Sequence, residues 1–187
     1  HGNIIRMYDS DGKHMLFFEP AFGGSLLGAY RAILPKAKGF LGYDHADRDQ
    51  AKGKVLGMAM VGLLRGLDFM HKNRYLHRDI NPDNILGAQD TGECIDGMSC
   101  QFLLGDLGEA DHIPSSDGDP PRAVCDLRGC KGRLTWSPPE TRPPGSPDDQ
   151  RERFWTSTGD VWALGMSLRE MIHPMKRVSK ACDEAWR

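Results

Sequence analysis

The sequence has 187 residues, of which 39% are hydrophobic and 27% are charged, which is the balance of one soluble globular domain. Its net charge of −2 gives no reason to expect nucleic acid or an anionic membrane as the main partner. The longest apolar stretch, Val55–Leu64, is about half of the roughly 20 residues that a membrane span needs, so no span is expected.

The cysteines and the first residues bear on cellular context. The sequence has five cysteines, an odd number, and no two of them form a CxxC motif. Neither a disulfide framework nor a zinc ribbon is therefore indicated. Reduced thiols and an intracellular, cytoplasmic location are therefore expected. There is no initiating Met and no signal-peptide pattern, so the chain is expected to begin inside a longer protein.

Near the N-terminus the sequence predicts a β-hairpin and then a short helix. Two apolar runs, Asn3–Tyr8 and His14–Phe18, flank an Asp-Ser-Asp-Gly segment that favours a turn. Glycines 23 and 24 end the second strand. Ser25 is suited to cap a helix that runs to about Ile33.

The clearest helical pattern lies between about Asp49 and His71. Apolar residues recur there at spacings of three and four and predict a buried face that consists of Leu56, Met60, Leu63, Leu64, Leu67 and Met70. Four glycines in the same stretch lower intrinsic helix stability by roughly 1 kcal/mol each. This helix is therefore expected to need tertiary packing.

The remaining predicted elements are shorter. Strands are expected at Ile85–Leu86 and Gln101–Leu104, on either side of a polar loop. Residues 109–132 are rich in Asp, Gly, Ser and Pro and predict a long loop. The last helix is expected from about Thr158 to Ile172.

The residues with catalytic potential lie between the long helix and the first of these strands, where residues 77–84 read His-Arg-Asp-Ile-Asn-Pro-Asp-Asn. Phosphoryl transfer from a nucleotide needs a carboxylate to orient the attacking hydroxyl and accept its proton, and oxygen ligands for Mg²⁺ nearby. Asp79 and Asn84, five residues apart in one loop, can supply both. A motif standing alone would fit equally well a solvated polar loop with a turn at Pro82.

Further motifs accompany this one in a fixed order. Residues 77–84 match the H-R-D-x-x-x-x-N loop of protein kinases at every fixed position. Asp106-Leu107-Gly108 resembles the kinase D-F-G, residues 136–140 resemble the end of the activation segment, and residues 160–165 resemble the start of helix F. Upstream, residues 1–8 and 17–26 resemble the segment after helix C and the strand that leads into the hinge. Over residues 1 to about 172 the sequence therefore resembles a eukaryotic-type protein kinase domain.

The resemblance implies an α+β, protein kinase-like fold that is mostly the α-helical C-lobe with the last strands of the N-lobe. It divides the partial domain 1–187 into the end of the N-lobe and the hinge at 1–24, and the C-lobe through helix F at 25–187. The glycine-rich loop, the N-lobe lysine and the helix C glutamate have no match in the sequence. The isolated chain is therefore expected to be weakly active or inactive, and a partner covering the truncated surface is a further expectation.

The resemblance also implies ATP and Mg²⁺ as cofactors and a protein hydroxyl, Ser or Thr, as the acceptor. Asp79 would be the catalytic base, and Asn81 would donate a hydrogen bond to the transferring phosphoryl group. Asn84 and Asp106 would hold the metal ion. Asp160 would hold the backbone of the catalytic loop.

For the adenine ring, the resemblance implies hydrogen bonds to the carbonyl of Glu19 and the N–H of Ala21. Phe18 would be the gatekeeper, and Leu86 would lie beneath the base. For these apolar residues, plain core packing is an equally good interpretation.

Two departures from the family pattern leave alternatives open. Asn81 stands where Ser/Thr kinases usually have Lys, and Arg133 stands where they place Thr, so the acceptor residue is in doubt. A pseudokinase that serves as an interaction scaffold is one alternative, and a small-molecule kinase of the aminoglycoside phosphotransferase type is another.

Arg78 is the type of arginine that pairs with a phosphorylated activation loop. The candidate phosphorylation sites are Ser115, Ser116, Thr135 and Ser137. The same hydroxyl residues would suit an ordinary solvated loop.

Overall fold

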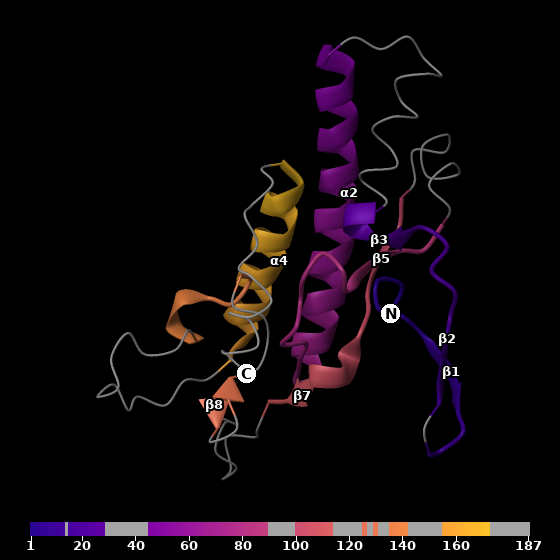
Figure 1. Ribbon diagram of the computed structural model, residues 1–187, viewed down its shortest axis with the longest axis vertical. Coiled ribbons are helices and arrows are strands. Elements are labelled where there is room, and N and C mark those ends of the chain that lie inside the picture. The colour runs from indigo at the N-terminus through magenta and orange to yellow at the C-terminus, as the bar shows by residue number, and fades with distance from the viewer. Residues whose placement is uncertain are drawn as a thin grey trace. The chain divides into compact units, whose positions relative to one another are not determined.

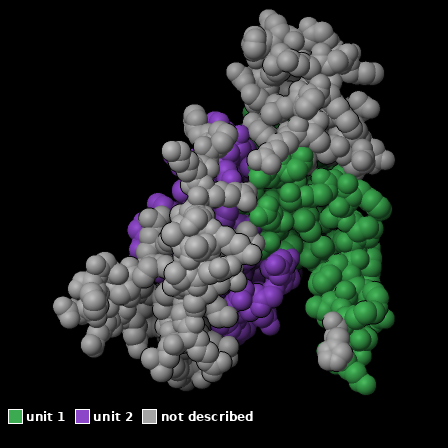
Figure 2. All heavy atoms as spheres, in the orientation of Figure 1, with its two compact units in different colours: residues 1–66, 82–105 green, residues 67–81, 106–187 purple. Residues whose placement is uncertain are grey.

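The computed structural model describes residues 1–13, 15–28, 45–89, 100–113, 125–126, 129–130, 135–141 and 155–172. The chain divides into two compact units, which Figure 2 shows in different colours. Unit 1 comprises residues 1–66 and 82–105, and unit 2 comprises residues 67–81 and 106–187. Within the described ranges, no helix combines the length and the apolar character that crossing a membrane requires.

A two-stranded hairpin lies at the beginning of unit 1. Strand β1 (Met7–Ser10) pairs antiparallel with β2 (Leu16–Phe18), which confirms the predicted hairpin (Figure 1). Gly12 has a φ of +70°, and the Asp11 carboxylate accepts the N–H of Met15 at 2.8 Å. A positive φ is readily available to glycine, so the Asp-Gly pair accounts for the position of the turn.

The first strand is shorter than predicted because its beginning pairs elsewhere. Leu104 donates its N–H to the carbonyl of Asn3, and Ile5 donates its N–H to the carbonyl of Leu104, both at 2.9 Å. Ile4 accordingly forms a parallel bridge with Leu104. The predicted strand Asn3–Tyr8 is thus divided between two partners, since tertiary contacts decide which backbone groups an extended segment bonds.

Unit 1 also contains a three-stranded antiparallel sheet in the order β3-β5-β6. Its strands are β3 (Gly24–Ser25), β5 (Ile85–Gly87) and β6 (Phe102–Leu104), so the two strands predicted around the polar loop are confirmed. A Cβ atom at Gly23 would be 2.5 Å from the carbonyl oxygen of Gln89. Glycine is therefore required at position 23 by a close approach of two backbone segments.

Ser25 performs the capping role that the sequence predicts. Its Oγ accepts the N–H of Gly28 at 3.3 Å, the contact typical of an N-cap side chain. Helical structure begins at Leu26. The rest of the predicted helix, as far as Ile33, lies outside the described residues.

Helix α2 (His45–Lys72) confirms the helix predicted over Asp49–His71, but its buried face differs from the prediction. Among the side chains of α2 that the structure describes, the buried apolar ones are Val55, Ala59, Leu63, Leu67 and Met70. Met60 and Leu64, which the pattern placed on this face, are 46% and 38% exposed. These residues are spaced by four from Val55 to Leu67, and Met70 follows three positions later. The periodicity of apolar residues alone did not distinguish this stripe from the adjacent one that contains Met60 and Leu64.

The glycines of α2 have a packing role. A Cβ atom at Gly66 would be 3.0 Å from the carbonyl oxygen of Asn3, and one at Gly62 would be 2.6 Å from Asn3 Nδ2. The same glycines that lower intrinsic helicity therefore allow the N-terminal segment of unit 1 to lie directly against the helix.

The described part of unit 2 includes two pairs of short strands. β4 (Tyr75–Leu76) pairs antiparallel with β7 (Asp111–His112), and β8 (Cys125–Asp126) pairs antiparallel with β9 (Gly129–Cys130). The expectation of a plain loop over 109–132 is wrong where β7, β8 and β9 form. Strands of two residues are too short to show an alternation of apolar and polar residues.

Helix α4 (Ser157–Ile172) is the last element among the described residues of unit 2, and it begins within one residue of its predicted start. Two 3₁₀ turns, η1 (Leu107–Glu109) and η2 (Pro139–Thr141), belong to the same unit. Helices and separate antiparallel sheets together confirm the predicted α+β class.

Cys100 is disulfide-bonded, which contradicts the expectation of five reduced thiols. Disulfide formation depends on how close two sulfur atoms lie in the fold, and cysteine spacing in the sequence does not report that distance. A disulfide is disfavoured in reducing compartments, so the cysteines lend no support to the predicted cytoplasmic location.

Candidate catalytic site

Asp160 is fully buried near the start of α4 and accepts hydrogen bonds on both of its carboxylate oxygens. Oδ2 accepts the backbone N–H of His77, and Oδ1 accepts the backbone N–H of Arg78, both at 2.9 Å. Hydrogen bonds to an ionised acceptor are stronger than those between neutral groups. The carboxylate therefore fixes the backbone that leads into Asp79, which confirms the structural role predicted for Asp160.

Two further side chains contact this carboxylate, and the sequence analysis predicted neither. Trp155 donates its Nε1–H to Oδ1 of Asp160 at 2.9 Å, and Nε2 of His71 lies 2.8 Å from Oδ2. Trp155 is 6% exposed, and a Cβ atom at Gly159 would be 3.0 Å from its Nε1. Gly159, one position before the aspartate, is the sequence signal that could have indicated a bulky side chain packed there.

The backbone of the His-Arg-Asp motif adopts an uncommon conformation. Arg78 has a φ of +70°, in the left-handed region, which costs a residue other than glycine about 1 kcal/mol or more. The two N–H bonds to Asp160 hold the backbone in this conformation. Residues 77–81 are all buried, and Asp79 is 9% exposed.

The two predicted catalytic residues, Asp79 and Asn81, lie together in unit 2. Asn81 is fully buried, and its Nδ2 donates to the backbone carbonyl of Asp79 at 3.0 Å. A side-chain amide that bonds a carbonyl two residues away closes a local ring and stiffens the turn. In this conformation the Asn81 amide therefore holds the backbone of Asp79 in place by a hydrogen bond.

The two predicted metal ligands belong to different units, Asn84 to unit 1 and Asp106 to unit 2. Asp106 is exposed with a φ of +54°, and its Oδ1 accepts the N–H of Gly108 at 3.3 Å. Asn84 is 7% exposed, and its carbonyl accepts the N–H of Gly105 at 2.8 Å. Among the described residues, no group of three His, Cys, Asp or Glu side chains could hold a metal ion. The ligand pair of one amide and one carboxylate stays a prediction.

The four predicted adenine contacts all belong to unit 1. Phe18 ends β2 and is 42% exposed, and Glu19 follows it directly. The carbonyl of Ala21 accepts the N–H of Gly24 at 3.2 Å, and Leu86 is half-buried in β5. Adenine binding by these four residues stays a prediction.

Unit 1 contains a pocket of about 630 Å³ away from the predicted adenine contacts. Its lining includes Asn3, Met58, Val61 and Arg65 and none of the four predicted adenine contacts. The predicted nucleotide site and the described pocket are therefore different places in unit 1.

Comparison with known proteins identifies the family. A family model described as the protein kinase domain matches residues 1–184. The chain is 31% identical over 175 residues to the MAP kinase kinase MKK1/SSP32 of Saccharomyces cerevisiae, which covers 91% of the chain and 27% of that protein. It is 27% identical over 174 residues to Mitogen-activated protein kinase kinase kinase 1 of Arabidopsis thaliana, covering 91% of the chain and 22% of that protein.

A third relative is named "Probable serine/threonine-protein kinase iksA", from Dictyostelium discoideum, and is 27% identical over 129 residues, or 67% of the chain and 13% of that protein. The chain thus spans between 13% and 27% of the length of these three relatives. The family model covers the two strands of the hairpin, the His-Arg-Asp loop and helix α4 alike. The chain therefore has an α+β, protein kinase-like fold and belongs to the protein kinase domain family.

Proposed function

We propose that the protein containing this chain transfers the γ-phosphoryl group of ATP to a protein hydroxyl of Ser or Thr, with Mg²⁺. The observation that carries the proposal is the attachment of the His-Arg-Asp backbone to Asp160. Phosphoryl transfer depends mainly on positioning and electrostatics, and this attachment holds the backbone beside Asp79 in one conformation.

Each predicted site residue has a role in this proposal. The Asp79 carboxylate orients the acceptor hydroxyl and takes its proton, while Asn81 keeps the backbone at Asp79 in place. Asp106 and Asn84 offer the carboxylate and amide oxygens that Mg²⁺ prefers, and a carboxylate with one bonded N–H still has lone pairs for a metal. A bound Mg²⁺ ion would neutralise charge on the phosphates.

The nucleotide would be held from unit 1. The backbone groups of Glu19 and Ala21 would bond the adenine edge, and Phe18 and Leu86 would flank the ring. The half-exposed Phe18 and half-buried Leu86 leave apolar surface for such a contact.

The Ser or Thr acceptor is supported by the relative that is named as a serine/threonine-protein kinase. Asn81 carries no charge where Lys is usual, so stabilisation of the transferring phosphoryl group is expected to be weaker than in typical members. A small-molecule kinase activity has no support among the three relatives, whose names are those of protein kinases.

Additional polypeptide is proposed to cover the β1–β2 hairpin. The hairpin exposes apolar side chains that monomeric proteins normally cover, namely Met7 (53%), Tyr8 (61%), Leu16 (59%) and Phe17 (45%). The missing phosphate-binding lysine and glycine-rich loop would belong to such a segment or partner. Without them the isolated chain would have weak or no activity.

A transfer assay on the full-length protein tests this function. Purified protein with Mg²⁺ and ATP should phosphorylate itself or a generic protein on Ser or Thr, which phosphoamino-acid analysis identifies. Asp79→Asn should lower the rate by about 100-fold or more. Asp68→Asn, in a surface pair with Lys72, is the matched control and should change it by less than about twofold. Absence of transfer by the wild-type protein would contradict the proposal.

The scaffold alternative retains one specific observation in its favour. The Asn81 side chain is buried against the backbone of Asp79, so it brings neither charge nor an exposed donor to the site. If the protein is a scaffold, a partner would bind the wild-type protein and the Asp79→Asn variant equally, and neither protein would transfer phosphate. The cytoplasmic location stays a prediction from the sequence.

A further inference from the structure

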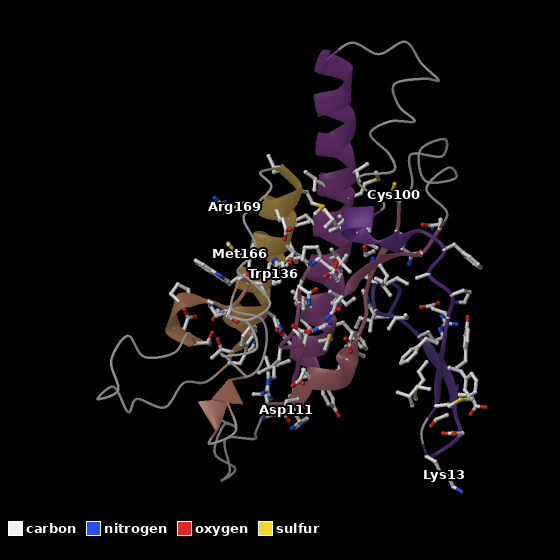
Figure 3. The ribbon with its side chains drawn as sticks, in the orientation of Figure 1. Lys13, Cys100, Asp111, Trp136, Met166 and Arg169 are labelled. Atoms are coloured by element: carbon white, nitrogen blue, oxygen red, sulfur yellow. The ribbon has the colours of Figure 1, made fainter. Side chains whose placement is uncertain are left out.

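Arg78 and Asp111 form an ion pair that is largely shielded from solvent. Arg78 Nη1 lies 2.6 Å from Asp111 Oδ2, and the two side chains are 9% and 17% exposed. Figure 3 shows Asp111 at strand β7 of unit 2. By contrast, the pair between Lys72 and Asp68 is 74% and 61% exposed. A buried charge pair is screened far less by water and salt, so Asp111 is a much stronger counter-ion than a surface carboxylate.

The position of Asp111 is fixed by backbone pairing. Leu76 lies opposite Asp111 in the β4–β7 pair, and Ile113 donates its N–H to the carbonyl of Arg74 at 2.6 Å. The Arg74 guanidinium returns hydrogen bonds to the Ile113 carbonyl at 3.3 and 3.2 Å. The pairing with Leu76 and the bonds at Ile113, two positions later, together fix the backbone that carries the Asp111 carboxylate.

The position of Arg78 is likewise fixed by its own backbone. Its backbone N–H is bonded to Asp160, and its left-handed φ of +70° sets the direction in which the side chain leaves the loop. Moving the guanidinium to another anion would break a short charge-assisted hydrogen bond inside the unit.

We infer that Asp111 is a positioning residue that supplies, as a permanent carboxylate, the anion that phosphorylation would otherwise provide to Arg78. A carboxylate and a phosphate both accept hydrogen bonds from a guanidinium, and they differ in that the carboxylate needs no modifying enzyme. The inference rests on the proposed function and specifies its regulation. Phosphate on the segment between Asp106 and Glu140 is not required to hold Arg78 beside Asp79.

The surroundings of one candidate phosphorylation site agree with this inference. Ser137 is 0% exposed, so in the described conformation its hydroxyl is not accessible to a modifying enzyme. A second anion at Arg78 would also lie beside the Asp111 carboxylate, and two like charges at one site repel each other.

The test compares phosphatase-treated and untreated full-length protein, with the removal of phosphate verified by mass spectrometry. Wild-type protein should keep its transfer rate within about twofold after treatment. The transfer rate of the Asp111→Asn variant should be about tenfold below that of wild-type protein. Asp68→Asn, in the exposed pair, should match wild type. Loss of most wild-type activity on treatment, together with an unaffected Asp111→Asn variant, would overturn the inference.

A double-mutant cycle separates positioning through Arg78 from a general structural effect. If Asp111 acts through the arginine, Asp111→Asn should have little further effect on the rate in an Arg78→Ala background. Full additivity of the two substitutions would contradict that route.

Amide hydrogen exchange tests the inference without any activity. Backbone amides of residues 106–113 should exchange equally in treated and untreated wild-type protein, and about tenfold faster in Asp111→Asn than in Asp68→Asn. If wild-type protein transfers no phosphate at all, the proposed function fails, and exchange alone decides the role of Asp111. The inference about Asp111 would be overturned if exchange in wild-type protein increased on phosphatase treatment and exchange in Asp111→Asn matched that of untreated wild-type protein.

Discussion

The indole nitrogen of Trp155 donates to Oδ1 of Asp160 at 2.9 Å, and the same oxygen accepts the backbone N–H of Arg78. A residue just before α4 therefore helps to orient the carboxylate that holds the His-Arg-Asp backbone. Because Asp160 is fully buried, each donor that it loses leaves part of its charge uncompensated.

Trp155→Phe is expected to lower the free energy of unfolding by about 1.5–3 kcal/mol, because it keeps an aromatic ring but removes a hydrogen bond to a buried charged acceptor. Urea denaturation measures the change. Trp162→Phe in α4 is the control, because Trp162 is 41% exposed, and it should cost less than about 0.5 kcal/mol. Equal effects of the two substitutions would show that the Trp155 hydrogen bond contributes nothing measurable.

Gly159→Ala and Gly165→Ala are expected to change stability in opposite directions, although both lie in α4. The first would place Cβ 3.0 Å from Trp155 Nε1, and the crowding should cost about 1–3 kcal/mol, more than the roughly 1 kcal/mol that alanine contributes to a helix. The second meets nothing within 4 Å and should stabilise by up to about 1 kcal/mol. Thermal unfolding of both variants measures the difference, and a stabilised Gly159→Ala would contradict the described packing.

A similar pair of substitutions tests how the N-terminal segment packs on α2. Gly66→Ala would place Cβ 3.0 Å from the carbonyl oxygen of Asn3 and 3.2 Å from Leu104 Cδ1, so a loss of about 1–3 kcal/mol is expected. Gly53→Ala has nothing within 4 Å and should stabilise by up to about 1 kcal/mol. Chemical denaturation reports both changes. Stabilisation by both substitutions would mean that residues 3–5 do not lie against the helix.

Asn81→Ala is expected to lower stability by about 1–2 kcal/mol, because the buried carbonyl of Asp79 loses its side-chain donor. If Asn81 acts by positioning Asp79, the turnover rate should fall while the KM for ATP changes little. Steady-state kinetics of the full-length protein separates the two quantities. A raised KM with an unchanged turnover rate would instead assign Asn81 to nucleotide binding.

Much of the fold was predictable because its signals are local. The Asp-Gly turn of the hairpin, the Ser25 cap and the periodic helices all depend on residues within a few positions of one another. The start of the first strand was not predictable, because Leu104, about one hundred positions away, takes the backbone groups of Asn3 and Ile5.

The candidate site divides in the same way. The His-Arg-Asp loop and Asp160 were identified from an ordered set of short motifs, and the hydrogen bonds between them confirm the role of Asp160. Trp155 and His71 were missed because neither belongs to a motif that the sequence analysis matched, and their relation to Asp160 depends on side-chain orientation. The disulfide at Cys100 was missed for the same kind of reason.

By itself the sequence determined the family and the order of the hairpin, the long helix and the last helix, and it predicted the residues from which a phosphoryl-transfer site would be built. These depend on residue types at fixed spacings along the chain. Tertiary structure alone decided that Asp111 is the partner of Arg78 and that the glycines of α2 accommodate Asn3. Ion pairs and close backbone contacts join residues tens of positions apart, and such distances exist only once the chain has folded.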